Sequence, residues 1–468
     1  MPISHIVAEG IGPFKKVHLD LRGPDGKASY GPHVLAGVNG SGKSTILKGL
    51  AWCIANKSRD GFPIAEWAQF LPDHAVSRVL VVFEAGDKQW ARAVAADKPG
   101  IVGAPLDDWV ANSLDSISVS LDLSKTSTVI PPLGAPSQFL SCTTRIYDEP
   151  GLPLGHTWAA YSPSRALRRL DEVKVSAQTS PSENRFSFEE TVSNEALQEW
   201  LVGLYSRRAI ARDRNQETEK YNATFRALEL GLQHVFGNHV SIVVDIEAQL
   251  LPKLKVGKQT LNFSQVPDGI KSTLGWMADF MRRCEDVSVH HPAGIRPEGI
   301  LLFDEIETFL HPVWQRRVLP AMRAALHTTQ FLVTSHSPFV ISSCRDAMIH
   351  VLKLGNDGYA YAEPPVNAPI GESITSTLKD IFGVDSRFDV ETEDELKEWN
   401  DLHKTRSSQK LTAKDEARFK ELTRTLGGRS EELHSIVNPV PKLAKSTVDS
   451  LTGDTPARSS RPKRAASR

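Results

Sequence analysis

The stretch GVNGSGKST, from Gly37 to Thr45, constrains the fold of this chain more than any other part of its sequence. It fits the pattern G-x-x-x-x-G-K-[ST], it follows the apolar run HVLA, and it precedes a segment with apolar residues on one helical face. Glycines let the backbone wrap around phosphate groups, and the helix that follows presents its positive end to them. The sequence therefore predicts a strand, a phosphate-binding loop and a helix, in that order.

The residue types in this loop suggest individual roles. We expect the Lys43 ammonium to reach the β- and γ-phosphates of ATP and the Ser44 hydroxyl to ligate Mg²⁺. The residues expected to surround the nucleotide are Gly37, Asn39, Gly40, Ser41, Gly42, Lys43, Ser44 and Thr45. The alternative is a plain glycine turn between a strand and a helix. The predicted strand and helix on either side favour the phosphate-binding interpretation, with ATP and Mg²⁺ as cofactors.

Two later apolar runs end in polar residues that suit the same site. GILLFDEIETFLHP ends its apolar part at Asp304 and Glu305, and FLVTSHSPF ends at His336. Ligands of open α/β sheets gather at the carboxyl ends of the strands. We therefore expect these three side chains to lie near the phosphate loop. The alternative is that they are solvated polar residues at strand ends, which is less consistent with their combination.

Each of these residues has an expected role. Asp304 would hold Mg²⁺ together with Ser44, and Glu305 would be the general base that activates a water molecule. A neutral His336 imidazole could hydrogen-bond the γ-phosphate or that water. The expected catalytic residues are thus Lys43, Glu305 and His336. Beyond them, we expect Glu307, Leu310 and His311 to extend a loop that a second subunit could touch.

The alternation of strands and helices predicts an α/β protein built on a parallel core. Strands are expected within 3–21, and a hairpin is expected from 77–85 and 88–96. Loops and short strands are expected over 97–155, and helices from about 189 to 236. The remaining expected elements are strands in VSIVVDIEA, LPKLKVG, GILLFDE, QFLVTS and MIHVLKL, a helix in PVWQRRVLPAMRAAL, and charged helices at 392–405 and 411–426.

Composition limits the class of protein. A hydrophobic fraction of 40%, a charged fraction of 24% and a net charge of −1 are those of a globular protein without a strong overall field. No apolar run approaches the roughly 20 residues of a membrane span, and the first residues do not resemble a secretory signal, so we expect no membrane contact. The scattered cysteines predict reduced thiols in a cytoplasmic protein and no zinc site: Cys53, Cys142, Cys284 and Cys344.

The three motifs together resemble the ABC-type ATPase superfamily, in the branch of RecF, SMC and OLD proteins. The resemblance implies an ABC-type P-loop ATPase head with a mixed or parallel central sheet, an antiparallel β subdomain, a helical lobe and a C-terminal helical segment. It also implies a signature loop that completes the nucleotide site of a partner subunit in a head-to-tail dimer. The matching residues, within NFSQVPDGIKS, are Pro267, Asp268, Gly269 and Lys271.

Pro267 stands where the family usually has Ser, so one hydroxyl and one backbone N–H are missing. We expect Asp268 to cap the helix that starts near Gly269, and Lys271 or Ser272 to supply a donor. The alternative is a plain helix start. Because of Pro267, a nucleotide-bound scaffold that rarely hydrolyses ATP is the rival to an active ATPase.

Four segments look like the stand-alone ATPases of bacterial anti-phage systems, and above all like those of Septu and Septu-like retron operons: VPDGIKSTLGWMADFMRR, FDEIETFLHPVWQRRVLPAMR, TSHSPFVI and LKDIFGVDSRF. The resemblance implies an ATP-hydrolysing regulatory subunit, a separate HNH-type nuclease partner, and dimers that could assemble further. A PARIS-like ATPase and a RecF-like DNA repair ATPase are the alternatives. OLD proteins carry a Toprim nuclease, but no acidic cluster on a strand follows His336 here.

The expected domains follow from these motifs. An ATPase domain over 1–375 would comprise an N-terminal lobe (1–96), a variable insertion (97–185), a helical lobe with a hairpin (186–260), and the signature, acidic motif and switch histidine (261–375). A helical partner-docking region over 376–438 and a basic, disordered tail over 439–468 would follow. The tail could contact nucleic acid phosphates weakly, although a solubilising role fits it better. Arg165 and Gln69 are weaker candidates for contact with the nucleotide.

Overall fold

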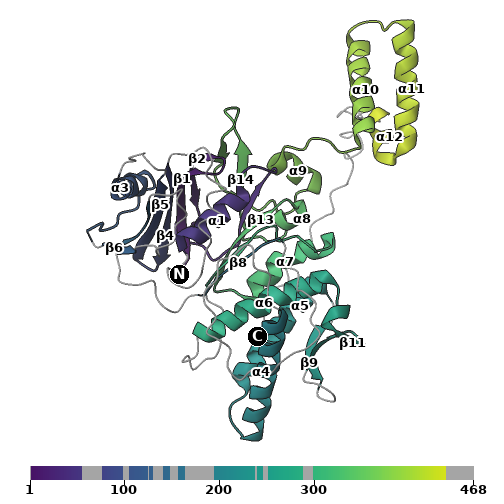
Figure 1. Cartoon of the computed structure of the whole chain (residues 1–468). Coiled ribbons are helices and arrows are strands. Elements are labelled where there is room, and N and C mark those ends of the chain that lie inside the picture. Colours follow the sequence, from purple (N-terminus) through teal and green to yellow (C-terminus); the bar gives the residue numbers. More distant parts are fainter. Residues whose placement is uncertain are drawn as a thin grey trace, which may run out of the picture. The chain divides into compact units, whose positions relative to one another are not determined.

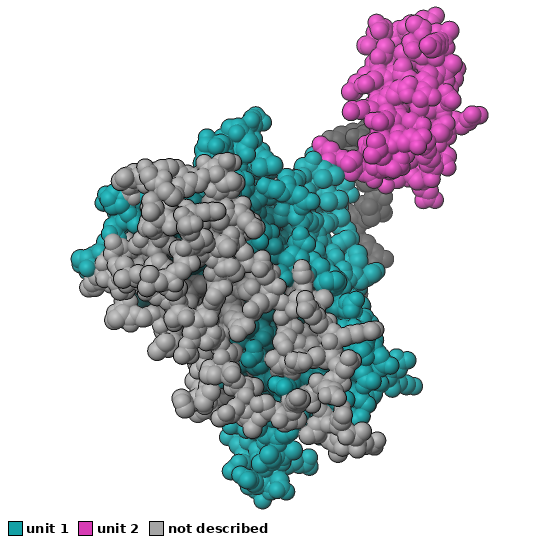
Figure 2. Space-filling model, viewed as in Figure 1, with its two compact units in different colours: residues 1–384 teal, residues 385–468 magenta. Residues whose placement is uncertain are grey.

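A computed structural model describes residues 2–54, 76–97, 105–124, 126–129, 141–147, 157–163, 194–237, 240–245, 251–287 and 299–438 of the chain. The chain divides into two compact units, Met1–Val384 and Asp385–Arg468 (Figure 2). Gln69, Arg165 and the basic tail lie outside the described residues, so their expected roles stay predictions.

The core of unit 1 is a sheet whose central strands are parallel, as expected (Figure 1). Its parallel strands run in the order β14, β3, β13, β12, β8, and the short strands β15 and β16 pair antiparallel with β14. All residues of β3, β12 and β13 are buried, and each strand has an apolar centre, as expected of parallel strands covered on both faces. The bounds are β3 His33–Gly37, β8 Thr157–Tyr161, β12 Gly299–Phe303, β13 Thr329–Ser335, β14 Met348–Leu354, β15 Ala360–Ala362 and β16 Val366–Asn367.

A second, antiparallel sheet is built mainly from the N-terminal region, in the order β2, β1, β4, β5, β7, β6. The expected hairpin is confirmed, because Ala85 of β4 pairs with Lys88 of β5 across the turn at Gly86. The bounds are β1 Ile3–Ile11, β2 Phe14–Asp20, β4 Val76–Ala85, β5 Lys88–Asp97, β6 Thr126–Val129 and β7 Ser141–Tyr147.

The expectation of only loops and short strands over 97–155 is wrong in one respect. Helix α3, Leu106–Ser116, packs Trp109, Val110 and Leu114 against the antiparallel sheet. These residues recur at helical spacing, and two acidic residues occupy the first turn of the helix, where the helix dipole favours negative charge. Both signals are present in the sequence, but the helix is short and lies within a region rich in proline, glycine and serine, whose composition is typical of loops.

Helix α1, Lys43–Ile54, joins the two sheets through one buried cluster. Its residues Ile46, Leu47 and Leu50 pack together with apolar side chains from β1 and β4 of one sheet and from β12 and β13 of the other. The phosphate loop precedes this helix. Its position is therefore held by the cores of both sheets.

The other face of the parallel sheet is covered by helices, which share a large buried cluster with β3, β12 and β13. Helices α4 and α5 confirm the expected helical region before residue 236. A small sheet of β9, β10 and β11 leads into α6 through a single 3₁₀ turn at Phe263–Gln265. The bounds are α4 Asn194–Asp213, α5 Glu219–Phe236, β9 Val240–Asp245, β10 Leu251–Val256, β11 Gln259–Asn262, α6 Asp268–Val287, α7 Pro312–Ala325, α8 Pro338–Ile341 and α9 Ile374–Phe382.

Unit 2 contains α10 (Val390–Ser408), α11 (Ala413–Arg429) and α12 (Glu431–Val437). The two expected charged helices are confirmed, and they pack around a small apolar core that includes Trp399, Phe419 and Leu422. The predicted partner-docking region begins at residue 376, whereas α9 belongs to unit 1, where Ile381 joins the large cluster. Within the residues described, no helix is long and apolar enough to cross a bilayer.

A buried histidine pair links β3 to β14 in the parallel sheet. The His33 Nδ1 lies 3.2 Å from the His350 Nε2, and the His33 Nε2 faces the carbonyl of Ser29 at 3.4 Å. With His33 Nε2 donating to Ser29, its Nδ1 can accept from His350, which requires a neutral His33. The Nδ1 of His350 is buried without a hydrogen-bond partner among the described residues, so a proton on it would also be unsatisfied. Burial lowers the pKa of His33 to about 4, and burial together with His33 lowers the pKa of His350 to about 3.

This pair predicts that the protein loses stability as the pH falls below about 6.5, the ordinary pKa of histidine. In that range the unfolded chain binds protons that the folded chain excludes, until the pH approaches the folded pKa values near 4 and 3. Each histidine can remove about 1.4 kcal/mol of unfolding free energy per pH unit. Urea unfolding at several pH values between 7 and 5 measures how steeply the unfolding free energy depends on pH. His350→Gln should make this pH dependence shallower, whereas His234→Gln, at an exposed position, should leave it unchanged. Equal pH dependence in the wild type and both variants would contradict its assignment to the buried histidine pair.

Candidate nucleotide-binding site

The phosphate loop between β3 and α1 depends on glycine at two positions. Gly37 and Gly42 have φ values of 149° and 88°. A Cβ on Gly37 would lie 2.3 Å from the carbonyl oxygen of Leu352, and one on Gly42 would lie 2.2 Å from the ring of Phe14. The loop is thus pressed against β14 and the β1–β2 turn, which fixes its curvature. Gly40 has open space around its Cα.

Lys43 is buried at the start of α1, and its ammonium folds back over the loop. The Nζ atom donates to the carbonyl oxygens of Gly37 and Val38, both at 2.9 Å. Burial lowers the pKa of Lys43, while the nearby carboxylates of Asp304 and Glu305 act in the opposite direction. The structure therefore holds a cation at the mouth of the loop, as predicted from the sequence pattern.

The structure also brings together the two predicted metal ligands, which are far apart in the sequence. The Ser44 hydroxyl donates to Asp304 Oδ1 at 2.8 Å. Asp304 follows the last residue of β12, and it is buried with only 6% of its surface exposed. Its backbone N–H donates to the carbonyl of Tyr161 on β8 at 2.9 Å, so the neighbouring strand fixes its position.

Thr334 on β13 organises both acidic residues. Its hydroxyl donates to Asp304 Oδ1 at 2.7 Å and accepts from the backbone N–H of Glu305 at 2.7 Å. Glu305 has a φ of 48°, in the left-handed region that non-glycine residues seldom adopt. Such a conformation costs roughly 1–3 kcal/mol and persists where its surroundings impose it. The hydrogen bond to Thr334 is one of those constraints.

His336 follows β13 and lies at the same edge of the sheet. Its backbone N–H donates to Glu307 Oε1 at 2.5 Å. Burial and the charge of Lys43 lower the pKa of the His336 imidazole, so the ring is neutral at pH 7. A neutral ring can donate from one nitrogen and accept at the other, which suits contact with a phosphate or a water.

Of the three residues expected to extend a loop that a second subunit could touch, Leu310 is buried, Glu307 is half-buried and His311 is exposed, so the expectation is wrong for Leu310 and stays a prediction for the other two. Glu307 Oε2 is a buried atom behind the switch histidine. Burial raises the pKa of the Glu307 carboxyl, although the bond from His336 N–H lowers it in part. His311 is exposed and caps α7, accepting from the Val313 N–H at 3.3 Å.

The remaining loop residues show that the site fits a nucleotide and a magnesium ion. The Ser41 hydroxyl is fully buried and has no hydrogen-bond partner among the described residues. Asn39 is exposed, and Thr45 packs against Gly12, whose Cβ would lie 2.7 Å from the threonine methyl. A glycine-lined loop with an unused buried hydroxyl and a buried ammonium suits phosphate oxygens. The hydroxyl and carboxylate oxygens of Ser44 and Asp304 suit Mg²⁺.

The predicted signature loop lies at the start of α6. The helix begins at Asp268, and the backbone N–H groups of Ile270 and Lys271 both donate to the carbonyl of Pro267 at 3.0 Å. The expectation that Asp268 caps the helix is therefore wrong, because Pro267 occupies the preceding position. The Asp268 carboxylate instead accepts from the Lys271 ammonium at 3.3 Å.

The same loop packs against the segment that follows the two acids. A Cβ on Gly269 would lie 2.7 Å from the carbonyl oxygen of Phe309, so this position also requires glycine. Pro267 and Asp268 are exposed, and so is Phe309, whose φ is 68°. The exposed residues of the loop thus lie at the surface beside the acidic motif. The Lys271 ammonium donates within the loop region, to the Asp268 carboxylate and to the Ser264 carbonyl.

Thr334 is the functional residue that sequence reasoning did not identify. The signal was present, since Thr334 lies within the quoted run FLVTSHSPF, two residues before His336. Its role depends on β12 and β13 being hydrogen-bonded neighbours in register, with Phe303 opposite Val333. That pairing is a tertiary fact, and the spacing of residues in the chain does not reveal it.

We predict that Thr334→Val lowers ATP turnover by about 10- to 100-fold while leaving the fold intact. Valine has nearly the same shape, but it removes one hydrogen bond to Asp304 and leaves the Glu305 N–H without a partner, at a cost of about 1–3 kcal/mol. Phosphate release measures the effect. Thr334→Ser keeps the hydroxyl and should retain most of the turnover; similar losses in both variants would refute the hydrogen-bonding role.

Comparison with protein families agrees with this geometry. Residues 5–129 match a family described as "AAA domain", and residues 144–342 match one described as "AAA domain, putative AbiEii toxin, Type IV TA system". The two ranges contain the phosphate loop and the two acids respectively. Both halves of the predicted site thus fall in segments that match AAA domains, and the phosphate loop with its parallel sheet forms the expected α/β fold.

Three curated relatives share short segments with the chain. "Retron Ec83 probable ATPase" of Escherichia coli is 35% identical over 99 residues, which are 20% of this chain and 18% of the relative. "Retron Vc95 probable ATPase" of Vibrio cholerae is 26% identical over 25% of this chain and 22% of the relative. "Septu protein PtuA" of Bacillus thuringiensis is 28% identical over 19% of this chain and 23% of the relative. The predicted similarity to retron and Septu ATPases is confirmed, over about a fifth of the length of these relatives.

Among solved structures, the chain is similar to the SMC head bound to the C-terminal winged-helix domain of ScpA. That likeness has a TM-score of 0.45 and 13% identity, and it covers 78% of this chain and 98% of the other. The SMC head domain from Thermotoga maritima gives a TM-score of 0.38 with 12% identity, over 78% of this chain and 99% of the other.

Proposed function

We propose that this chain, which carries AAA-family ATPase domains, binds and hydrolyses Mg·ATP as the regulatory subunit of a bacterial anti-phage defence complex. The observation that carries the ATPase part is the bond between Ser44 of the phosphate loop and Asp304 of the acidic motif, with Glu305 and His336 at the same sheet edge. The similarity to retron and Septu ATPases supports the assignment to defence.

The side chains divide the chemistry among them. Lys43 and the loop N–H groups would bind the phosphates. Ser44 and Asp304 would hold Mg²⁺, which would shield the phosphate charge. Glu305 takes a proton from the attacking water, and His336 supplies a neutral hydrogen-bonding ring beside the γ-phosphate. Thr334 keeps the two carboxylates in place.

The active form is a head-to-tail dimer in which each phosphate loop faces the signature loop of the other copy. The exposed positions of Pro267, Asp268 and Phe309, beside the acidic motif, support this arrangement. The helix start would direct N–H groups at a γ-phosphate. ATP would then hold the dimer closed, and hydrolysis would release it.

The partner is an HNH-type nuclease, which the region over 376–438 would contact. The similarity to Septu and retron proteins supports this proposal. We place the protein in the cytoplasm. A PARIS-like ATPase, a RecF-like repair ATPase and a slowly hydrolysing scaffold are the alternatives. The neighbouring gene distinguishes the proposal from the first two of them: an HNH nuclease indicates a Septu-like system, a Toprim protein a PARIS-like ATPase, and repair genes a RecF-like ATPase.

Mixing two inactive variants tests the dimer. Lys43→Ala removes the phosphate-loop cation and Lys271→Ala removes the signature-loop ammonium, so each should lose at least about 90% of its turnover when alone. In a one-to-one mixture, half of the dimers combine both chains, and each such dimer has one intact site. We expect about a quarter of the wild-type phosphate release to return.

The matched control replaces the second chain by the double variant Lys43→Ala, Lys271→Ala, which cannot supply an intact phosphate loop. This mixture should recover nothing. If the first mixture also recovers nothing although both chains are folded and dimeric, the head-to-tail arrangement is wrong. If Lys271→Ala alone keeps full turnover, the signature loop is misassigned.

A further inference from the structure

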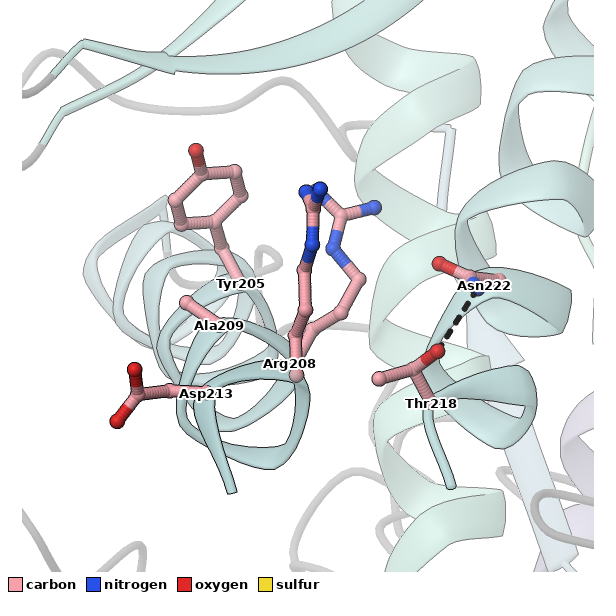
Figure 3. Close-up of a pocket in the computed structure, with 7 residues that line it drawn as sticks. Tyr205, Arg208, Ala209, Asp213, Thr218 and Asn222 are labelled. Atoms are coloured by element: carbon pink, nitrogen blue, oxygen red, sulfur yellow. Dashed lines mark hydrogen bonds between the residues drawn. The ribbon is translucent and has the colours of Figure 1, made fainter. Parts of the chain in front are cut away.

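A polar cavity of about 870 Å³ lies between α4 and α5, near the end of one helix and the start of the next. Its lining residues are Tyr205, Arg208, Ala209, Arg212, Asp213, Thr218 and Asn222. It belongs to the helical hairpin, and none of its residues takes part in the nucleotide site described above. Figure 3 shows Arg208 between the side chains of Tyr205 on α4 and Asn222 on α5.

Arg208 is held by aromatic rings. Its guanidinium carbon lies 5.0 Å from the centre of the Tyr205 ring and 4.7 Å from that of Phe225. Within the described parts of the chain it has no carboxylate within ion-pair distance. Rings hold a guanidinium through its faces, so the N–H groups in its plane stay available to a ligand.

The neighbouring Arg207, on the same helix, has a carboxylate partner and so differs from Arg208. It points elsewhere and forms an ion pair with Glu285 at 2.5 Å. Arg212, one turn after Arg208 on the cavity side, is exposed and likewise has no ion pair among the described residues. Two positive charges one turn apart repel each other, which an anion between them would relieve.

The opposite wall is the start of α5. Thr218 precedes the helix, and its side chain forms no capping hydrogen bond to the helix; it accepts from the Asn222 amide at 3.4 Å. The positive end of the α5 dipole therefore faces the cavity, together with a hydroxyl and an amide. Asp213 is the one acid in the lining, and its carboxylate is turned away from the Arg208 guanidinium (Figure 3).

We propose that this cavity binds a nucleotide unit, with its phosphate between Arg208 and Arg212 and its base against the Tyr205 ring. Two guanidinium groups, a hydroxyl and a helix N-terminus match the acceptor oxygens of a phosphate. The exposed part of the aromatic ring offers the stacking surface that nucleobases use. The proposal is independent of the ATPase mechanism and of the basic tail.

The test is fluorescence anisotropy of the full-length protein with a labelled oligo-dT strand of about 15 nucleotides in about 50 mM NaCl. The double variant Arg208→Gln, Arg212→Gln should weaken binding at least about tenfold and reduce the salt slope by about 1.4, the value for two phosphate contacts on a single strand. Arg214→Gln removes the same charge at the same helix end but outside the cavity, and it should change affinity less than about twofold.

Two further variants separate binding from folding. Arg212→Gln alone alters an exposed residue and should still weaken binding, with an unchanged melting temperature. Arg208→Lys keeps the charge but loses the planar fork, so it should bind more weakly than wild type. Tyr205→Phe should bind like wild type, because the ring and not the hydroxyl carries the contact.

Competition distinguishes a nucleic acid strand from a free nucleotide. In a Lys43→Ala background, which silences the phosphate loop, thymidine monophosphate is titrated against the labelled strand and also measured alone by calorimetry. Strand binding that depends on Arg208 and Arg212 and resists the monophosphate identifies a strand. Monophosphate binding with the same dependence identifies a free nucleotide. Binding of neither probe, or equal affinity in the double variant and the Arg214→Gln protein, overturns the proposal.

Discussion

We expect Glu305→Gln to bind ATP but to turn it over at least about 100-fold more slowly than the wild type, the typical contribution of a general base. Glutamine has nearly the same shape and accepts a hydrogen bond, but it does not take up a proton from water. The backbone contact between Glu305 N–H and Thr334 remains, so the left-handed turn and the position of Asp304 survive. Phosphate release and single-turnover quenching measure the effect.

The same variant should accumulate as an ATP-bound dimer, because hydrolysis no longer opens it. Size-exclusion chromatography with light scattering, with and without Mg·ATP, detects the shift. Glu391→Gln, at an exposed position on α10, is the matched control and should behave like the wild type. Wild-type turnover in Glu305→Gln together with no trapped nucleotide would remove Glu305 as the base.

The result also separates the active ATPase from the scaffold alternative. If Pro267 makes the wild type a slow enzyme, its own turnover is already low, and Glu305→Gln changes it little while both proteins hold ATP. The wild-type rate with and without the nuclease partner is therefore measured in the same series. A rate that rises on addition of the partner supports regulated hydrolysis.

Lys43→Ala has the second large expected effect: the affinity for Mg·ATP falls by at least about 100-fold, or about 2.7 kcal/mol. The ammonium is the buried cation that meets the phosphates, and alanine also leaves the carbonyl groups of Gly37 and Val38 without their donor. The carboxylates of Asp304 and Glu305 then repel the incoming phosphates without compensation.

Calorimetry with Mg·ATP measures the loss directly. A thermal shift assay gives a second reading, because a ligand that binds the folded state raises the melting temperature and Lys43→Ala should show almost no rise. Lys16→Ala removes a lysine from an exposed position on β2 and should keep the full shift. A wild-type shift in Lys43→Ala would mean that the phosphate loop does not bind the nucleotide.

Much of the nucleotide site could be predicted because its chemistry is local in the sequence. The spacing of Gly37, Gly42 and Lys43 encodes a loop that glycine and one lysine suffice to build. Asp304 and His336 could be assigned to the same edge because both follow buried apolar strands, and parallel strands end together.

Other features depend on contacts between segments that are distant in the sequence, and these could not be predicted. Glu307 reads as one more acid in an exposed loop, but the packing of that loop against β13 buries its Oε2 atom behind His336. Helix α6 starts one residue earlier than expected, so the capping role passes from Asp268 to Pro267. The paired arginines of the α4–α5 cavity look like ordinary surface charges until α5 is placed opposite them.

By itself, the sequence determined the phosphate loop, the two acids, the switch histidine and the α/β class, because each depends on residue types at short spacing. Only the tertiary structure decided that Ser44 touches Asp304, that Thr334 joins Asp304 to Glu305, and that Arg208 is left without a carboxylate partner among the residues described. These contacts depend on strand order and helix packing. Such long-range arrangements arise from burying the whole apolar surface at once, and no local pattern of residues encodes them.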